Sequence, residues 1–368
     1  MKFSVLQENF AKGLQIISRA TPTKASLPVL SNVLIVAKNG SIGLSATNLE
    51  TAIITKIGAS IDKEGSAAVP AKLIKDFVTN LPPNTIKATL KDHVLHLQSD
   101  KTKSRFNGVN PQDFPVLPDR PKKAKYIELS PEDLILVAGT VAFAAGNDVS
   151  RPVLTGIYLK YSRGKLIAAS TNGFRLSEKK IKVQGNSDSF STVIPAKTFL
   201  EVARIFGNSE EPIKIVVNED ENLTSFFADD TFVTTRMLEG QYPDYNKIIP
   251  KDSSISAVFS AEEFLEAVKL TSIFAKESNS TIKLRLDPEG EIKVVSLSGE
   301  TGEHESTFPA EIDGKLMEIA FNSKYLLDFL SNVKPNQLTL TATGNTSPCV
   351  ITPDNHRDFL HIVMPVQL

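Results

Sequence analysis

Cysteine is almost absent from this sequence. The single cysteine among 368 residues, Cys349, has no partner for a disulfide within the chain and excludes a metal cage built from several cysteines. One cysteine also fits the reducing interior of a cell, so we expect a cytoplasmic protein. Because Cys349 stands between Pro348 and Val350, it is predicted to be a small core residue rather than a nucleophile.

Long hydrophobic runs are missing as well. The N-terminal segment MKFSVLQENF lacks the apolar region of a signal peptide. The most apolar stretch, LILVAGTVAFAAG at 134–146, is shorter than the roughly 20 residues that a membrane-spanning helix needs. We therefore expect a soluble chain that does not enter a membrane.

Neither sign of charge is in excess. The 41 Lys and Arg residues nearly balance the 42 Asp and Glu residues, and the formal net charge is −1. Any attraction to nucleic acid must therefore come from a local basic surface, because the chain as a whole supplies none.

The sequence also lacks the common catalytic motifs. GxGxxG, GxxxxGK[ST], GxSxG and HExxH do not occur in it. His93 and His96 come closest to a metal-binding pair, but on an alternating strand they would face opposite sides of the sheet. We expect no catalytic residue, no metal and no cofactor.

What the sequence does contain is a threefold repeat. The segments KFSVLQENFAKGL, YIELSPEDLILVA and ISAVFSAEEFLEAV recur at intervals of about 125 residues. Lys72, Lys197 and Lys324 occupy matching places in AVPAKLIKDFV, VIPAKTFLEVA and IAFNSKYLLDFL. Asn48 and Asn172 match in the same way, in LSATNLETAI and AASTNGFRLS. The repeat predicts three homologous domains, at 1–120, 121–250 and 251–368.

Each predicted domain is itself doubled. Helices are expected at 7–20, 71–80, 131–145, 196–206, 261–276 and 322–333, and period-two runs such as 213–217 and 338–342 predict antiparallel strands between them. The fold class is therefore α+β, with one strand–helix–strands unit used six times. Two such chains paired about a two-fold axis can close into a ring, which removes free sheet edges at the joints.

Several segments, in their order along the chain, resemble those of a known family. ATNLETAI, VPAK, RPVLTG, STNGFRL, YPDYNKIIP and VMPVQL resemble the bacterial DNA polymerase III beta subunit, the sliding-clamp family, over the whole chain. The resemblance implies three DNA-clamp domains per chain and a head-to-tail homodimeric ring around double-stranded DNA, held without sequence specificity. It also implies a clamp loader as a partner, and replicative and other DNA polymerases that insert a peptide of the type Gln-Leu-x-Leu-Phe. Members of the family are not enzymes, so the resemblance implies no catalytic activity, and it implies no contact with a membrane.

The resemblance places the peptide cleft between the second and third domains. It assigns sixteen residues there: Leu154, Thr171, Gly173, Phe174, Arg175, Leu176, Pro243, Lys247, Ile248, Asn322, Tyr325, Ile362, Val363, Met364, Pro365 and Val366. Apolar walls would accept Leu and Phe side chains of a partner. Taken without the resemblance, Leu154, Leu176 and Ile248 are as well explained as core. Phe174 and Lys247 stand where His and Arg are frequent in the family, so peptide preference is expected to differ.

DNA contacts and the ring joint are also assigned by resemblance. Lys24 and Arg151 match positions near DNA, and Lys72 and Lys197 lie on helices expected to line the ring. The six predicted helices carry nine basic and nine acidic residues, so no basic lining follows from composition. Each of these lysines can equally be a solvated surface residue.

The ring joint is assigned to Phe106 on the first domain and to Ile273 and Phe274 on the third. Phe106 can equally be an ordinary strand residue that faces inward. Two alternatives to a sliding clamp stay open at this point. One is a peptide-binding scaffold outside replication, and the other is a DNA-modifying enzyme built on duplicated strands.

Overall fold

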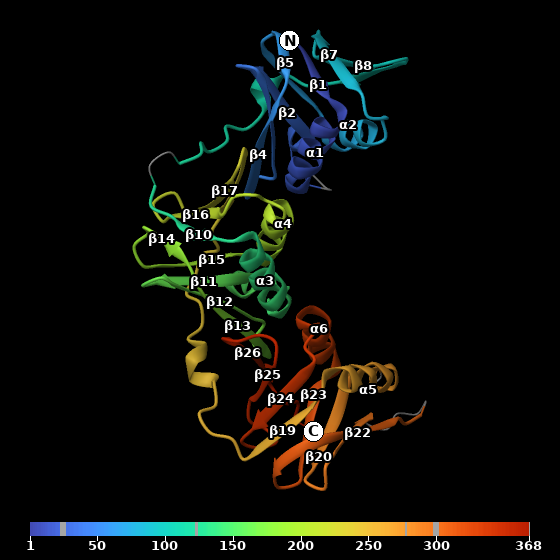
Figure 1. The fold of residues 1–368 in the computed structure, drawn as a ribbon, viewed down its shortest axis with the longest axis vertical. Coiled ribbons are helices and arrows are strands. Elements are labelled where there is room, and N and C mark those ends of the chain that lie inside the picture. Colours follow the sequence, from blue (N-terminus) through green and yellow to red (C-terminus); the bar gives the residue numbers. More distant parts are fainter. Residues whose placement is uncertain (23–26, 122–123, 277, 297–301, 368) are drawn as a thin grey trace. The chain divides into compact units, whose positions relative to one another are not determined.

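The computed structural model describes residues 1–22, 27–121, 124–276, 278–296 and 302–367 (Figure 1). Lys24, expected near DNA, lies outside these residues. Within them the predicted strand–helix–strands unit occurs six times, each time as one strand, one helix and three strands, which confirms the α+β fold class. In the first repeat these elements are β1 (Lys2–Leu6), α1 (Gln7–Ile17), β2 (Asn32–Lys38), β3 (Ser41–Thr47) and β4 (Thr51–Gly58), then β6 (Gly65–Pro70), α2 (Ala71–Thr79), β7 (Thr85–Lys91), β8 (Val94–Ser99) and β9 (Thr102–Asn107).

The second and third repeats follow the same order. The second has β10 (Ile127–Leu129), α3 (Pro131–Val141), β11 (Gly156–Ser162), β12 (Lys165–Thr171) and β13 (Arg175–Lys182), then β15 (Phe190–Pro195), α4 (Ala196–Phe206), β16 (Ile213–Asn218), β17 (Leu223–Ala228) and β18 (Thr231–Arg236). The third has β19 (Ile255–Ser260), α5 (Ala261–Phe274), β20 (Thr281–Asp287), β21 (Glu291–Ser296) and β22 (Glu305–Gly314), then β23 (Met317–Asn322), α6 (Ser323–Val333), β24 (Gln337–Ala342), β25 (Cys349–Pro353) and β26 (Phe359–Val363). Two short strands, β5 (Ser60–Lys63) and β14 (Gln184–Gly185), are added.

Local sequence explains where the helices begin and end. The Ser260 side chain accepts a hydrogen bond from the Glu263 N–H at 3.4 Å and caps α5, as expected of Ser-Ala-Glu-Glu. Asn322 caps α6 by accepting from the Lys324 N–H at 3.0 Å. The first helix is shorter than predicted, because α1 ends at Ile17 and continues only as one 3₁₀ turn over Ser18–Ala20.

The chain packs as two compact units whose limits differ from those of the sequence repeats. The first unit comprises residues 1–131, 184–187 and 201–237. It holds a five-stranded sheet, β5-β1-β7-β8-β9, and a nine-stranded sheet, β14-β10-β16-β17-β18-β4-β3-β2-β6. In the larger sheet β18 of the second repeat pairs with β4 of the first, with Thr51 opposite Thr235.

The second unit comprises residues 132–183, 188–200 and 238–368. Its twelve-stranded sheet runs β15-β11-β12-β13-β26-β25-β24-β19-β22-β21-β20-β23. Here β26 of the third repeat pairs with β13 of the second, with Arg175 opposite Val363. In both units, therefore, the last strand of one repeat extends a sheet of the repeat before it.

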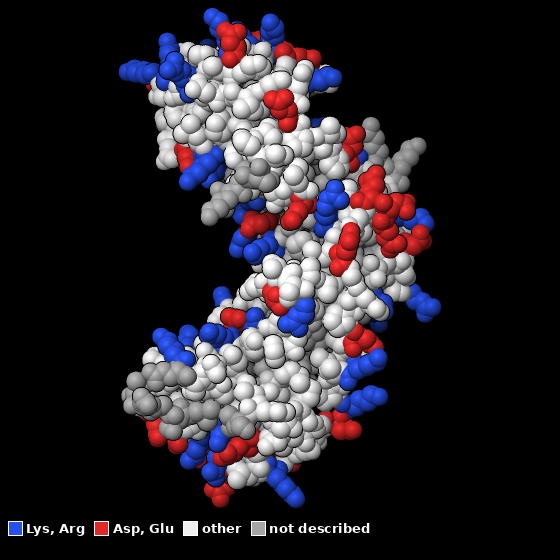
Figure 2. All heavy atoms as spheres, turned by 180° about the vertical axis from the view of Figure 1, so that it is seen from behind, with Lys and Arg blue, Asp and Glu red and all other residues white. Residues whose placement is uncertain are grey.

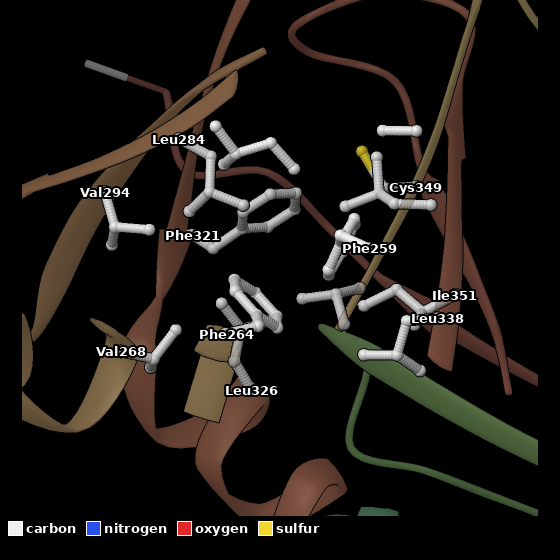
Figure 3. Packing of buried hydrophobic residues seen from close by; sticks show 14 of the residues in the cluster. Phe259, Phe264, Val268, Leu284, Val294, Phe321, Leu326, Leu338, Cys349 and Ile351 are labelled. Carbon is white, nitrogen blue, oxygen red and sulfur yellow. The ribbon is translucent and has the colours of Figure 1, made fainter. Parts of the chain in front are cut away.

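The core of the third repeat is apolar and rich in phenylalanine (Figure 3). The ring of Phe264 lies 5.1 Å from that of Phe259 and 5.9 Å from that of Phe308, measured between centroids. Cys349 is fully buried within this cluster, and burial raises the pKa of its thiol to about 12. The predicted role of Cys349 as a core residue is confirmed, since a thiol with such a pKa is a poor nucleophile near neutral pH.

The two histidines do not share an alternating strand, contrary to the expectation from the sequence. His93 is not on a strand but in the turn before β8, with φ of 61°. Among the described residues no group of three or more His, Cys, Asp or Glu side chains is placed to hold a metal ion. No helix in that part of the chain is long and apolar enough to cross a membrane.

Candidate functional site

The apolar C-terminal segment leaves the sheet and is held at two points. His361, Ile362 and Val363 are buried in β26 between β13 and β25. Beyond the strand, the Met364 N–H donates to the carbonyl of Phe174 at 2.8 Å, and the Val366 N–H donates to that of Ala320 at 2.8 Å. The side chains of residues 364–366 stay partly exposed. The segment is therefore fixed in position while part of its apolar surface remains open.

The turn between β12 and β13 faces this segment. Asn172 Oδ1 accepts from the N–H groups of Phe174 at 2.9 Å and Arg175 at 3.0 Å, and the Thr171 hydroxyl donates to the Arg175 carbonyl at 2.6 Å. Gly173 takes φ of 92°, which favours glycine. This hydrogen-bonded turn presents Phe174 to solvent with 55% of its surface exposed.

Arg175 joins the turn to α6. Its guanidinium donates to Asp328 Oδ2 at 2.6 Å and to the Phe143 carbonyl, and lies 4.8 Å from the centre of the Tyr325 ring. The ring of Phe174 stacks on that of Tyr325 at 6.5 Å. Because Arg175 is buried and paired, it acts mainly to position the aromatic pair Phe174 and Tyr325.

The segment before the third repeat lies against the same sheet. The Tyr245 hydroxyl donates to Glu178 Oε2 at 2.6 Å, and burial together with this carboxylate raises the pKa of Tyr245. Tyr245, Ala169, Leu176 and Ile362 form one small apolar cluster. Ile248, three residues later, keeps 40% of its surface exposed.

The sixteen residues assigned to the peptide cleft therefore divide into two layers. Six are buried and support the surface from below: Leu154, Thr171, Arg175, Leu176, Ile362 and Val363. The others are at least partly exposed: Gly173, Phe174, Pro243, Lys247, Ile248, Asn322, Tyr325, Met364, Pro365 and Val366. Lys247 pairs with Asp244 at 3.4 Å, and Asn322 serves as the α6 cap. We call the exposed set the tail surface.

Several supporting residues were not found from the sequence. Tyr245 and Glu178 anchor the segment around Ile248, and Asp328 holds Arg175. For Tyr245 the sequence did offer a signal, because two tyrosines occur within YPDYN, a turn-like stretch where solvated residues are expected. Nothing in the sequence indicated the role of Asp328, since an acidic residue in an amphipathic helix is ordinarily solvated.

Of the residues expected near DNA, the three that the structure describes, Lys72, Lys197 and Arg151, are exposed. Lys72 and Lys197 lie in the first turns of α2 and α4, and Arg151 pairs with Asp148 at 3.5 Å. Acidic partners are interspersed among the basic groups, as where Glu201 pairs with Arg19 at 2.5 Å. Figure 2 shows the same mixture of both signs on the face it displays.

The residues expected at the ring joint differ in exposure. Phe106, on the edge strand β9, is only 3% exposed and packs on Phe77, with 5.4 Å between ring centroids. Ile273, near the end of α5, is 57% exposed. Phe274 is partly buried and stacks on His304 at 5.3 Å.

Known proteins match this chain from end to end. Family models described as the N-terminal, central and C-terminal domains of the DNA polymerase III beta subunit match residues 1–118, 128–244 and 246–367. The beta sliding clamp of Synechococcus elongatus is 30% identical over 375 residues, and that of Bacillus subtilis is 28% identical over 381, each over the full length of both chains.

Solved structures agree with these relatives. The B. subtilis sliding clamp superimposes with a TM-score of 0.94 at 26% identity, over 100% of this chain and 99% of the other. A sliding clamp from Pseudomonas aeruginosa, bound to griselimycin, gives 0.93 at 25% identity and covers 100% of both chains. With three family models in order along one chain of the same fold, this protein belongs to the DNA polymerase III beta subunit family, the beta sliding clamps.

Proposed function

We propose that this protein encircles double-stranded DNA as a head-to-tail homodimer and tethers DNA polymerases to it. The observation that carries the proposal is the end-to-end match to the three domains of the beta subunit family. The proposal places three clamp domains at 1–120, 121–250 and 251–368, and the three separate family models, in the same order along the chain, support this division. A clamp holds its partners and catalyses no reaction, which removes the DNA-modifying enzyme from consideration. A clamp loader and a cytoplasmic location belong to the same proposal.

The tail surface is the proposed site for the partner peptide. Phe174, Ile248 and Met364 offer apolar contact, and the positions of Phe174 and Met364 are fixed by backbone hydrogen bonds and by the paired Arg175. A preorganised apolar surface loses little entropy when a peptide binds, and Leu and Phe side chains gain from being covered. Lys247 and Asn322 supply polar groups at the edge.

DNA contact is proposed to be sequence-independent. Lys72, Lys197, Arg151 and Lys24 would approach phosphates, and a closed ring holds DNA topologically even where each contact is weak.

The sheet topology suggests how two chains join. Each repeat has two halves, and each half has one strand, one helix and three further strands. In the pairs β4 with β18 and β13 with β26, the last strand of a first half pairs with the last strand of a second half. β22 is the strand of the third repeat that is equivalent to β4 and β13, and β9 is the strand of the first repeat that is equivalent to β18 and β26. β9 is also the edge of its five-stranded sheet. We therefore assign the ring joint to β9 of one protomer and β22 of its partner.

The register of this joint follows from the repeats. In the two observed pairings, Thr51 lies opposite Thr235 and Arg175 lies opposite Val363. When the repeats are aligned, Gly302 takes the place of Thr51 and Arg175. Phe106 takes the place of Thr235 and Val363. A side chain at Gly302 would lie 3.6 Å from the ring of Phe274. Phe106 of one chain would thus lie opposite Gly302 of the other, beside Phe274 and close to Ile273. The same register puts Lys103 opposite Glu305.

Changing Ile273 to Asp is expected to shift the dimer towards monomer. A carboxylate in the apolar part of an interface costs about 2 kcal/mol or more, or roughly 30-fold in the dimer dissociation constant. Sedimentation velocity over a concentration series measures this. Leu316→Asp, another exposed apolar position of the same unit, is the matched control. A dimer as tight as the original would show that α5 lies outside the joint.

Retention on DNA tests the function as a whole. The loaded protein is expected to stay on nicked circular DNA through a high-salt gel-filtration column and to leave the same DNA once it is cut to a linear form. Salt screens phosphate contacts but does not open a ring. Equal loss from circular and linear DNA would refute topological tethering and leave a peptide-binding scaffold outside replication.

A further inference from the structure

The turn that forms part of the tail surface has a close copy in the first unit. The Thr47 hydroxyl donates to the Thr51 carbonyl at 2.9 Å, as that of Thr171 does to the Arg175 carbonyl. Asn48 Oδ1 accepts from the N–H groups of Glu50 at 3.0 Å and Thr51 at 2.7 Å, as Asn172 does from the matching residues. The two turns therefore share one hydrogen-bond pattern, 124 residues apart in sequence.

The residues around this turn correspond as well. The Arg236 N–H donates to the Glu50 carbonyl at 2.9 Å, which repeats the bond from Met364 to Phe174. In DFPVLP, Phe114 is buried like Tyr245, and Val116 takes the place of Ile248. Val116 is 99% exposed, more than any other large apolar side chain among the described residues.

These residues line an open pocket of about 410 Å³ within the first unit. Its apolar lining includes Leu49, Ala52, Val116, Leu117, Pro118 and Leu223. We call it the Val116 pocket. The volume falls in the range of ligand sites, and an apolar lining with a fully exposed valine at the mouth is suited to cover by apolar side chains.

The charges at the Val116 pocket differ from those at the tail surface. Glu50 replaces Phe174 and Arg236 replaces Met364 at matching positions, and Glu221 also lines the cavity. Glu50, Glu221 and Arg236 are all exposed. Two carboxylates against one guanidinium leave the mouth acidic, so a basic side chain in the occupant would find a partner of opposite charge.

We propose that the Val116 pocket is a second peptide site, which takes a short extended segment of a partner protein with apolar residues next to Lys or Arg. The proposal rests on the peptide-binding role of the tail surface, because the shared turn is what relates the two. One clamp would then carry two sites of different charge preference on each protomer, and two partner segments would not compete for one position.

The test isolates the pocket by disabling the tail surface. Two synthetic peptides serve as probes, Lys-Lys-Gln-Leu-Ser-Leu-Phe and Glu-Glu-Gln-Leu-Ser-Leu-Phe, with blocked ends. Calorimetric titration of the full-length dimer with the Lys probe is expected to give two sites per protomer, and Met364→Asp is expected to leave one. In the Met364→Asp background, Val116→Ser with Leu49→Ser should abolish the remaining binding, since both side chains are exposed and their loss leaves the fold intact.

A further variant tests the preference of the Val116 pocket for a basic peptide. In the Met364→Asp background, Glu50→Lys is expected to weaken the Lys probe about fivefold and to strengthen the Glu probe. Glu64→Lys, at another exposed acidic position of the first unit, is the control and should change neither. No binding to the Met364→Asp protein, with one site per protomer in the original, would overturn the second site alone. Two sites that Met364→Asp does not reduce would instead overturn the role of the tail surface.

Discussion

Replacing Met364 by Asp is expected to weaken binding of a Gln-Leu-Ser-Leu-Phe peptide at the tail surface by at least about 30-fold, or 2 kcal/mol. The Met364 side chain is partly exposed, while its N–H is bonded to the Phe174 carbonyl. A bound peptide would cover the side chain and remove a carboxylate there from water without a cation to pair with it. Fluorescence anisotropy of a labelled peptide measures the change.

Two controls separate this effect from damage to the fold. Met364→Leu keeps an apolar side chain and should bind within about threefold of the original, because the two residues are similar in volume. The dimer dissociation constant of Met364→Asp should be unchanged, since Met364 follows β26, which three strands of the same sheet separate from β22. If Met364→Asp lost the dimer and kept the peptide, the tail would belong to the ring joint.

Acid is expected to destabilise the second unit through His361. The imidazole is fully buried, stacks on Phe329 at 4.7 Å between centroids, and binds the Ser177 hydroxyl through Nδ1 at 2.8 Å. Its Nε2 is buried without a hydrogen-bond partner. Burial, and then the positive charge of Arg175, lower the pKa of His361 to about 3. The ring is therefore neutral in the folded protein at ordinary pH.

The direction of the pH dependence follows from proton binding. An unfolded histidine takes up its proton below about pH 6.5, whereas folded His361 does so only near pH 3. The unfolded state binds more protons between these values, so the contribution of His361 to stability is constant above about pH 6.5 and falls as the pH drops towards 3. The slope from this one group approaches about 1.4 kcal/mol per pH unit, or about 2 kcal/mol between pH 7.5 and 5.0.

His361→Phe isolates this contribution. Phenylalanine keeps the stacking on Phe329 but cannot be protonated, and it costs a pH-independent amount because Ser177 loses a partner. Urea unfolding followed by circular dichroism at pH 7.5 and 5.0 should show a smaller loss of stability in the variant, by about 2 kcal/mol. Equal losses in both proteins would mean that His361 is protonated in the folded state.

The internal repeats made much of the fold predictable. The repeated segments that carry Lys72, Lys197 and Lys324 identified helices to within a few residues, because amphipathic spacing acts over a single turn. The α1 end was missed, since its last residues remain helical but tighten into a 3₁₀ turn.

The candidate site was only partly predictable. Phe174, Arg175 and Met364 are contiguous with recognisable segments, but which of them is exposed depends on distant partners. Arg175 is buried because Asp328, 153 residues away, accepts its hydrogen bond. No local pattern reports such a pairing, because either charge alone reads as a solvated surface residue.

The sequence by itself determined the number of repeats, the α+β class and the family, because these depend on spacing along the chain. Only the tertiary structure decided that β18 extends the sheet of β4 and β26 that of β13, so that packing units cross the repeat boundaries. Strand pairing between repeats depends on backbone hydrogen bonds, which carry no side-chain signature. The same pairing fixes the two matching turns in place, and leaves Phe174 and Met364 at one of them where Glu50 and Arg236 stand at the other.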